Sequence, residues 1–108
     1  MVKEITAQEL SDRLAAGEAV QLLDVRQPWE HEIAALPGSQ LVPLPELPAR
    51  LGEISVPPGV LLVVYCHHGI RSRSAAHFLE RAGVAAVASL AGGIDAWSLE
   101  VDPRVPRY

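Results

Sequence analysis

The sequence predicts an α/β fold in which helices flank a central, mostly parallel sheet. Three short, predominantly apolar runs carry this prediction: residues 60–65, 19–25 and 84–90. Such runs, rich in Val, Leu or Ala and bounded by turn signals, are typical of strands buried on both faces, as in a parallel sheet. A helical pattern opens at residues 72–76, directly after the first run. Ligands bind at the carboxyl ends of strands in such sheets.

The first element expected along the chain is a helix that begins at Thr6. Residues 6–9, Thr-Ala-Gln-Glu, match a capping box, in which two side chains satisfy free backbone amides. Leu10 and Leu14 then fall on one helical face, and Gly17 ends the helix. We interpret this helix as scaffold.

The remaining elements follow from prolines, glycines and helical periodicity. Five prolines within residues 43–58 predict a rigid crossover containing one or two helical turns. Residues 75–82 have one apolar helical face. Gly92-Gly93 suits a tight turn into a last helix, whose Ile94 and Trp97 should pack on the sheet. The tail from residue 101 to 108 contains two prolines and is expected to be extended.

Length and composition limit the classes of protein. We expect residues 1–108 to form one domain with its own core. A net charge of -4 disfavours nucleic-acid binding, which needs a basic patch. We expect no membrane segment and no signal peptide, because no apolar stretch is long enough and the first five residues do not begin a leader. One cysteine excludes an internal disulfide and favours a reducing, cytoplasmic location.

Cys66 is the strongest candidate for a reactive group. It follows the strand 60–65 and precedes a short loop that leads into a helix. Unpaired amides at a helix start favour an anion, so we expect them to favour the thiolate. Gly69 permits a tight loop, and Arg71 can bind the oxygens of an oxyanion. The alternative is a buried, inert cysteine, but polar residues follow Cys66, so we expect it at the exposed rim.

His67 and His68 come directly after the cysteine. They either add positive potential to the loop or face solvent. We expect no metal there, since adjacent histidines without further ligands at suitable spacing are seldom a metal site.

Asp24 and Arg26 stand at the end of the run 19–25. If this strand is a parallel neighbour of 60–65, both residues reach the same sheet edge as Cys66. Such residues hold a loop or a ligand in many α/β enzymes. The alternative is that Asp24 caps a short helix that begins at Pro28.

Three groups of residues together resemble the rhodanese-type sulfurtransferases. Residues 66–72, Cys-His-His-Gly-Ile-Arg-Ser, match the active-site loop pattern Cys-x-x-Gly-x-Arg-Ser of that family. Two further groups agree in order and spacing: Asp24-Val25-Arg26 with Pro28, Glu30, Leu36-Pro37-Gly38-Ser39 and Pro43-Leu44, and Leu90-Ala91-Gly92-Gly93-Ile94-Asp95-Ala96-Trp97. The resemblance covers most of the chain.

The resemblance implies a three-layer fold around a five-stranded sheet, with no metal or organic cofactor. It implies a catalytic role for Cys66 and substrate-binding roles for residues of the loop and of the neighbouring strand: Arg71, Arg26, His67, His68, Gly69, Ile70 and Ser72. By the same resemblance, Asp24 would orient the loop through an ion pair or backbone hydrogen bonds, and Arg26 would help to select the sulfur donor.

Two stretches refine this resemblance. Ala34-Ala35 stands where many members have Gly-His, a change that bears on pocket shape rather than on the chemistry. Residues 30–38, 93–97 and 102–108 resemble the rhodanese domains attached to ubiquitin-activating-type adenylyltransferases, which pass sulfur to small carrier proteins. The expected partners are therefore a small sulfur donor, such as thiosulfate or a persulfide, and a thiol or sulfur-carrier protein as acceptor.

The expected reaction is a double displacement through a Cys66 persulfide. Three alternatives remain. A non-catalytic binding module is disfavoured because Cys66, Gly69 and Arg71 are all present. Cysteine-dependent phosphatases and arsenate reductases resemble one another in a Cys-x5-Arg loop, with five residues between the cysteine and the arginine. Only four residues separate Cys66 from Arg71, which disfavours this alternative. A thiol redox protein would need a resolving cysteine.

Overall fold

The computed structural model describes residues 2–108, so Met1, the first residue of the expected domain, lies outside it. The elements in chain order are β1 (Glu4–Ile5), α1 (Ala7–Ala15), β2 (Val20–Asp24), α2 (Pro28–Ile33), β3 (Gln40–Leu41), the 3-10 turns η1 (Leu44–Glu46) and η2 (Leu51–Glu53), β4 (Leu61–Tyr65), α3 (Ile70–Arg81), β5 (Val87–Leu90) and α4 (Gly93–Glu100).

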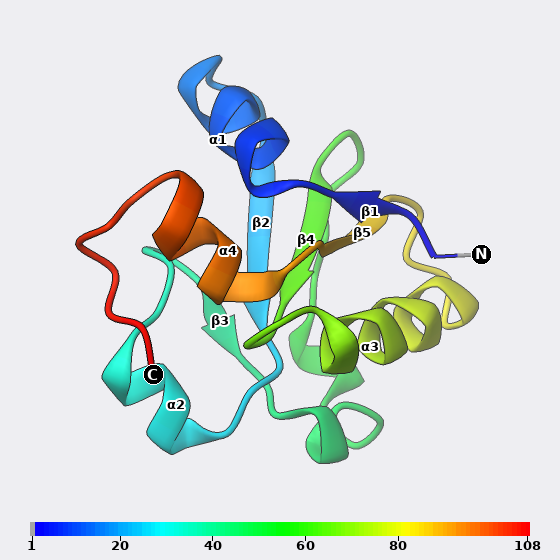
Figure 1. The fold of residues 1–108 in the computed structure, drawn as a ribbon. Coiled ribbons are helices and arrows are strands. Elements are labelled where there is room, and N and C mark those ends of the chain that lie inside the picture. The colour runs from blue at the N-terminus through cyan, green and yellow to red at the C-terminus, as the bar shows by residue number, and fades with distance from the viewer. Residues whose placement is uncertain (1) are drawn as a thin grey trace.

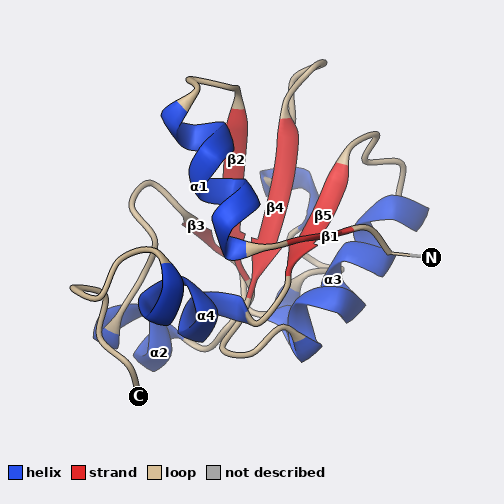
Figure 2. Ribbon diagram, turned by 45° about the horizontal axis from the view of Figure 1, so that its top comes forward, coloured by secondary structure: helices blue, strands red, loops and turns tan. Residues whose placement is uncertain are grey.

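The strands form one five-stranded sheet in the order β1-β5-β4-β2-β3, and every strand pair is parallel. Helices α1 and α4 contact each other on one face, whereas α3 packs on β4 and β5 from the other face (Figures 1 and 2). The predicted three-layer α/β fold is therefore confirmed, with a sheet that is entirely parallel.

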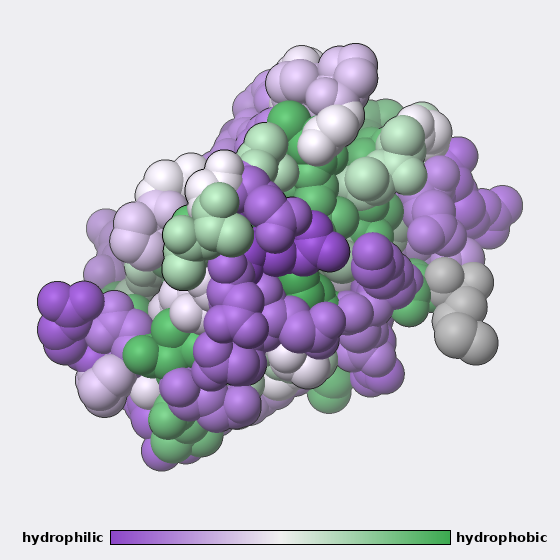
Figure 3. Space-filling view, turned by 90° about the horizontal axis from the view of Figure 1, so that it is seen from above, coloured by the Kyte–Doolittle hydropathy of each residue, from purple (hydrophilic) through white to green (hydrophobic). Residues whose placement is uncertain are grey.

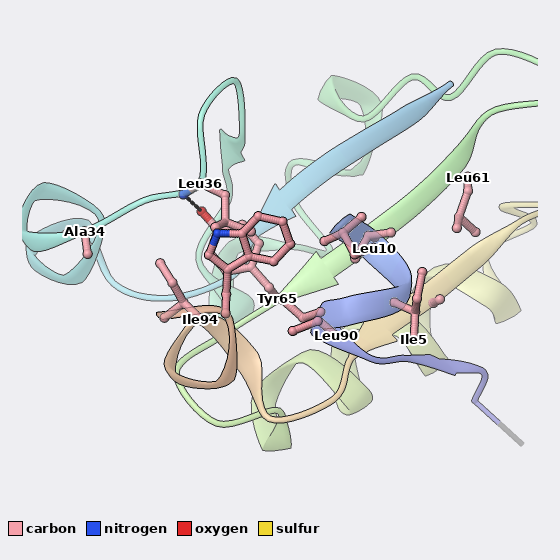
Figure 4. Close-up of a cluster of buried hydrophobic side chains, with 12 residues drawn as sticks. Ile5, Leu10, Ala34, Leu36, Leu61, Tyr65, Leu90 and Ile94 are labelled. Carbon is pink, nitrogen blue, oxygen red and sulfur yellow. Dashed lines mark hydrogen bonds between the residues drawn. The ribbon is translucent and has the colours of Figure 1, made fainter. Parts of the chain in front are cut away.

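Strand β4 lies in the middle of the sheet, and all five of its residues are buried. Leu61, Val63 and Tyr65 contribute to the core cluster on the α1 and α4 face, shown in Figure 4. Leu62 and Val64 belong to the cluster on the α3 face, as does Cys66 directly after the strand. This alternation along an extended chain directs Cys66 toward α3.

The other predicted elements differ mainly at their ends. Thr6 caps α1, and the amide of Glu9 donates to its Oγ1 over 3.1 Å, which confirms the capping box. Helix α3 begins at Ile70 rather than Ser72, because the left-handed backbone of Gly69 turns the chain straight into it. Strand β5 begins three residues later than expected, since the amide of Val84 still donates to Leu79 at the end of α3.

Away from Cys66, the described surface includes a cleft beside the segments that precede β4 and β5. The face seen from above in Figure 3 mixes polar and apolar residues. A cleft of about 390 Å³ is lined by residues 56–60 and 82–86, just before β4 and β5, and so lies at the opposite end of these strands from Cys66. Nucleophilic and titratable side chains are missing from its lining. Across residues 2–108, none of the helices is both long enough and apolar enough to span a membrane.

Candidate active site

The thiol of Cys66 is enclosed by the loop that follows it. The amides of Gly69 and Ser72 donate to its Sγ over 3.1 Å and 3.3 Å. These amides lie at the start of α3, where backbone donors have no partner within the helix. Cys66 is only 1% exposed, so its expected place at an exposed rim is wrong. The loop curls over the sulfur, and the side chain points toward α3 instead of solvent.

Helix α4 fixes this loop from the other side. The amides of Ile94 and Asp95 donate to the carbonyl oxygens of Cys66 and His67 over 2.9 Å and 3.1 Å. Gly93 has a φ of +62°, and a Cβ there would overlap both carbonyl groups. A glycine is therefore required at residue 93, because only glycine combines this backbone conformation with so close an approach.

Arg71 is paired with a glutamate that the sequence did not single out as a site residue. Its Nη1 and Nη2 donate to the two carboxylate oxygens of Glu30 over 2.7 Å and 2.9 Å. The hydrogen bonds with Glu30 raise the pKa of Arg71 further. Arg71 thus lies at the expected position in the loop, with its two terminal nitrogens directed at α2.

Glu30 itself is held by several donors. Burial would raise the pKa of its carboxyl, but hydrogen bonds from Arg71, from the amide of Gln27 and from Tyr108 lower the pKa to about 2. The hydroxyl of Tyr108 donates to Oε2 over 2.7 Å. Glu30 therefore stays ionised and orients the guanidinium of Arg71.

The depressed pKa of Glu30 predicts acid sensitivity. A carboxyl whose pKa is lower in the folded than in the unfolded protein contributes stability above its unfolded pKa, and this is lost as pH falls through the folded value. When the pH falls from about 5 to about 2, we expect the protonation of Glu30 to lower the unfolding free energy by roughly 2 kcal/mol. The full pKa difference would give a larger value, but solvent partly screens the charge of Arg71. Urea unfolding of wild type and Glu30→Gln at both pH values measures this. An equally steep loss in the variant would contradict it.

Asp24 and Arg26 do not have the contacts expected of them. Both side chains are fully buried. The carboxylate of Asp24 accepts from Arg26 Nε over 2.9 Å and Nη2 over 2.7 Å, and it lies 2.8 Å from Nδ1 of His31. Within residues 2–108, its side-chain hydrogen bonds all go to Arg26 and His31. The expected bond from Asp24 to the Cys66 loop is therefore wrong, as is a cap on α2, where Gln27 is the N-cap residue.

The guanidinium of Arg26 is hydrogen-bonded to other groups of the protein and does not face a ligand. Its guanidinium donates to Asp24, to the carbonyl of Ala34 and, over 2.8 Å, to the hydroxyl of Tyr108. Burial works against its charge, but the hydrogen bond with Asp24 raises its pKa overall. A donor could touch this group only by displacing these partners, so the placement does not support the expected selection of donors by Arg26.

The C-terminal tail returns to the candidate site rather than simply extending away from it. It runs past α4 and ends beside α2 (Figure 1). A turn closes between Asp102 and Val105, and Arg107 donates to Asp95 over 2.9 Å. The ring of Tyr108 stacks on His67 with centroids 3.9 Å apart. Sequence reasoning missed this role, since a tyrosine in a proline-containing tail carries no periodic signal.

His67 and His68 stack on each other with ring centroids 3.9 Å apart. Burial, together with the charge of neighbouring His68, lowers the pKa of His67. His67, His68 and Asp95 place potential ligand atoms within 4.8 Å of one another. The two rings are inclined by only 26°, however, so their in-plane lone pairs cannot both point at one ion. This geometry does not favour a metal site.

Ile70 and Ser72 lie on opposite sides of the helix start. Ile70 is 70% exposed, whereas Ser72 is fully buried. The hydroxyl of Ser72 lies 3.5 Å from Cys66 Sγ and 2.7 Å from the hydroxyl of Ser89 in β5. Sequence reasoning missed Ser89, although a serine within an apolar strand is an available signal.

Comparison with known proteins agrees with this arrangement. A model of the rhodanese-like domain family matches residues 6–100. A sulfurtransferase of Allochromatium vinosum is 40% identical over 98 residues, which are 91% of this chain and 90% of that protein. A probable adenylyltransferase/sulfurtransferase, MoeZ, of Mycobacterium tuberculosis is 36% identical over 104 residues, or 96% of this chain. The chain spans only about a quarter of that relative's length, 26%.

A solved structure agrees as well. The human single-domain sulfurtransferase TSTD1 superposes with a TM-score of 0.77 at 25% identity, over 93% of this chain and 98% of that one. These findings confirm both resemblances noted from the sequence, the general one and the one to domains attached to adenylyltransferases. Because the family match extends over most of its length, the chain belongs to the rhodanese-like domain family.

Proposed function

We propose that the protein is a sulfurtransferase that carries sulfur as a persulfide on Cys66. The observation that carries this proposal is the pair of amide hydrogen bonds from Gly69 and Ser72 to Cys66 Sγ. Backbone donors aimed at a sulfur atom stabilise a thiolate, and the thiolate is the nucleophilic form of cysteine. The relatives named as sulfurtransferases support the same class of reaction.

The proposed reaction has two displacements. The Cys66 thiolate attacks the outer sulfur of thiosulfate, a new S–S bond forms, and sulfite leaves with the electron pair of the broken S–S bond. Cyanide, a thiol or a sulfur-carrier protein then attacks the outer sulfur of the persulfide. The electron pair of that bond returns to Cys66, whose thiolate the two amides stabilise again. Only one sulfur atom of the donor has to enter the loop, which suits so enclosed a thiol.

The assay is thiocyanate release from thiosulfate and cyanide. The proposal expects turnover in the wild type and a stable Cys66 persulfide when cyanide is left out. The near-complete burial of Cys66 favours one competing function, a non-catalytic binding module, in which the thiol is inert. Absence of both thiocyanate and persulfide would favour that module. The reaction itself is compatible with a reducing cytoplasm, which we propose as the location because it keeps the thiol free.

Replacing Arg71 by alanine should weaken the binding of thiosulfate more than it slows turnover. The change removes the cation nearest the carboxylate of Glu30, and the negative charge that remains repels an anionic donor. We expect the KM for thiosulfate to rise by about tenfold and kcat to change less. Arg71→Lys should recover only part of the loss, because an ammonium cannot form the bidentate pair.

Arg104→Ala is the matched control for Arg71→Ala. Arg104 also donates to a carboxylate, that of Asp102, but it is exposed and belongs to the tail. Steady-state kinetics of both variants should show a normal KM in the control. A KM for Arg71→Ala within about twofold of the wild type would show that its charge does not assist the donor.

A further inference from the structure

Two buried hydroxyl groups lie behind the thiol. Ser72, in the first turn of α3, and Ser89, in β5, are both fully buried, and their Oγ atoms are 2.7 Å apart. The cluster around Cys66 on this face is otherwise apolar. A buried hydroxyl costs free energy unless it is hydrogen-bonded. The pair therefore needs a reason to be there, and the polar atom next in line is Cys66 Sγ, 3.5 Å from Ser72 Oγ.

Counting protons shows whether this row of hydrogen bonds favours a thiol or a thiolate at Cys66. Three atoms in a row, Ser89 Oγ, Ser72 Oγ and Cys66 Sγ, offer two places for a hydrogen bond. With a thiolate there are two protons: Ser89 donates to Ser72, and Ser72 donates to the sulfur. With a thiol, whose Sγ is placed to donate to Ser72 Oγ, there are three protons for two places, so one proton is left buried without an acceptor among these atoms. Every proton in this row of hydrogen bonds therefore has an acceptor only when the sulfur is an anion.

Ser89 decides the direction of the Ser72 hydroxyl. Among the described residues, the side chain of Ser89 forms its hydrogen bond with Ser72. When Ser89 donates to Ser72, the Ser72 proton has no acceptor among these three atoms except Cys66 Sγ. Without Ser89, Ser72 can still donate to the thiolate, but its hydroxyl loses the donor that polarises it, so this hydrogen bond and the preference for the thiolate weaken.

Building on the function proposed above, we propose that Ser89 is a positioning residue that makes Ser72 donate to the Cys66 thiolate. These hydrogen bonds stabilise the thiolate in both displacements, because Cys66 Sγ is the attacking anion in the first and receives the electron pair in the second. Ser89 touches neither donor nor acceptor. It acts through Ser72, on the side of the sulfur that faces the protein core.

The test is a pH titration of the thiolate followed by its ultraviolet absorbance, which requires no sulfur donor. Cys66 is the only cysteine of the chain, so the signal has one source. We expect the midpoint in Ser89→Ala to move up by roughly a few tenths of a pH unit, because Ser72 keeps its contact with the sulfur and loses only the donor that strengthens it. Ser89→Thr keeps the hydroxyl and should return the midpoint toward that of the wild type.

Ser98→Ala is the matched control, because Ser98 is also a buried serine but donates to the backbone carbonyl of Ile94 within α4. Its midpoint should equal that of the wild type. In a Ser72→Ala background, Ser89→Ala should add no further shift. The inference is overturned if folded Ser89→Ala titrates like the wild type, or if the two serine changes shift the midpoint additively.

The titration separates this inference from the sulfurtransferase function. If the protein transfers no sulfur but the midpoint shifts as expected, the hydrogen-bond chain stands and the proposed function fails. If thiocyanate is released and the midpoint does not move, the function stands and the role of Ser89 fails.

Discussion

Cys66→Ser should abolish thiocyanate release, lowering turnover by about three orders of magnitude or more. A serine hydroxyl stays protonated at neutral pH and cannot hold a transferable sulfur as a persulfide. Because Cys66 is the only cysteine, no neighbouring thiol can replace it. Initial rates with thiosulfate and cyanide, compared at equal protein concentration, measure the loss.

The same variant should remain folded. A serine oxygen at residue 66 still accepts from the amides of Gly69 and Ser72, which hold the sulfur in the wild type. Circular dichroism and thermal unfolding provide the control. A folded variant that retains more than about a tenth of wild-type turnover would show that sulfur does not pass through Cys66.

Gly93→Ala should cost both stability and activity. A Cβ at residue 93 would overlap the carbonyl groups of Cys66 and His67, and backbone cannot move aside as a flexible side chain can. The loop or the start of α4 must shift, and the amide hydrogen bonds of Ile94 and Asp95 to those carbonyls would lengthen. We expect a loss of about 3 kcal/mol or more in unfolding free energy, with turnover reduced in the protein that still folds.

Gly17→Ala separates the overlap from the backbone conformation. Gly17 has a φ of +75°, close to the +62° of Gly93, but its added Cβ would meet no atom within 4 Å. This variant should lose only the roughly 1–2 kcal/mol expected for a side chain in the left-handed region. Urea unfolding of the two variants measures the difference. Equal losses would show that the contact between α4 and the loop is not tight.

The apolar runs predicted the three central strands because a strand buried on both faces leaves a continuous apolar record. Strands β1 and β3 have two residues each, too few for any pattern. The resemblance implied five strands but did not place these two. The start of α3 was placed two residues late because the left-handed turn at Gly69 depends on backbone geometry.

The sequence predicted the loop at the centre of the candidate site, but not the distant side chains that surround this loop. The local motif brought Cys66, Gly69 and Arg71 together, since these residues are close in the chain. Contacts between distant segments had no comparable signal. Tyr108 reaches Glu30 across 78 residues, and this tertiary arrangement determines where Arg71 points.

The burial of Arg26 shows a further limit of sequence reasoning. A charged residue at a strand end usually faces solvent or a ligand, and the residue type of Arg26 indicates nothing else. Here Asp24, two residues away, supplies a paired acceptor, so the guanidinium can remain inside. Burial of a charge depends on such a partner, which becomes evident only when the geometry is known.

The intact mass of the protein after incubation with thiosulfate, and again after cyanide, tests the central claim most directly. A Cys66 persulfide adds the mass of one sulfur atom, about 32 Da, and cyanide should remove it with release of thiocyanate. Cys66→Ser should gain no mass. A wild-type mass that does not change with thiosulfate or with a persulfide donor would contradict the proposal that Cys66 carries sulfur.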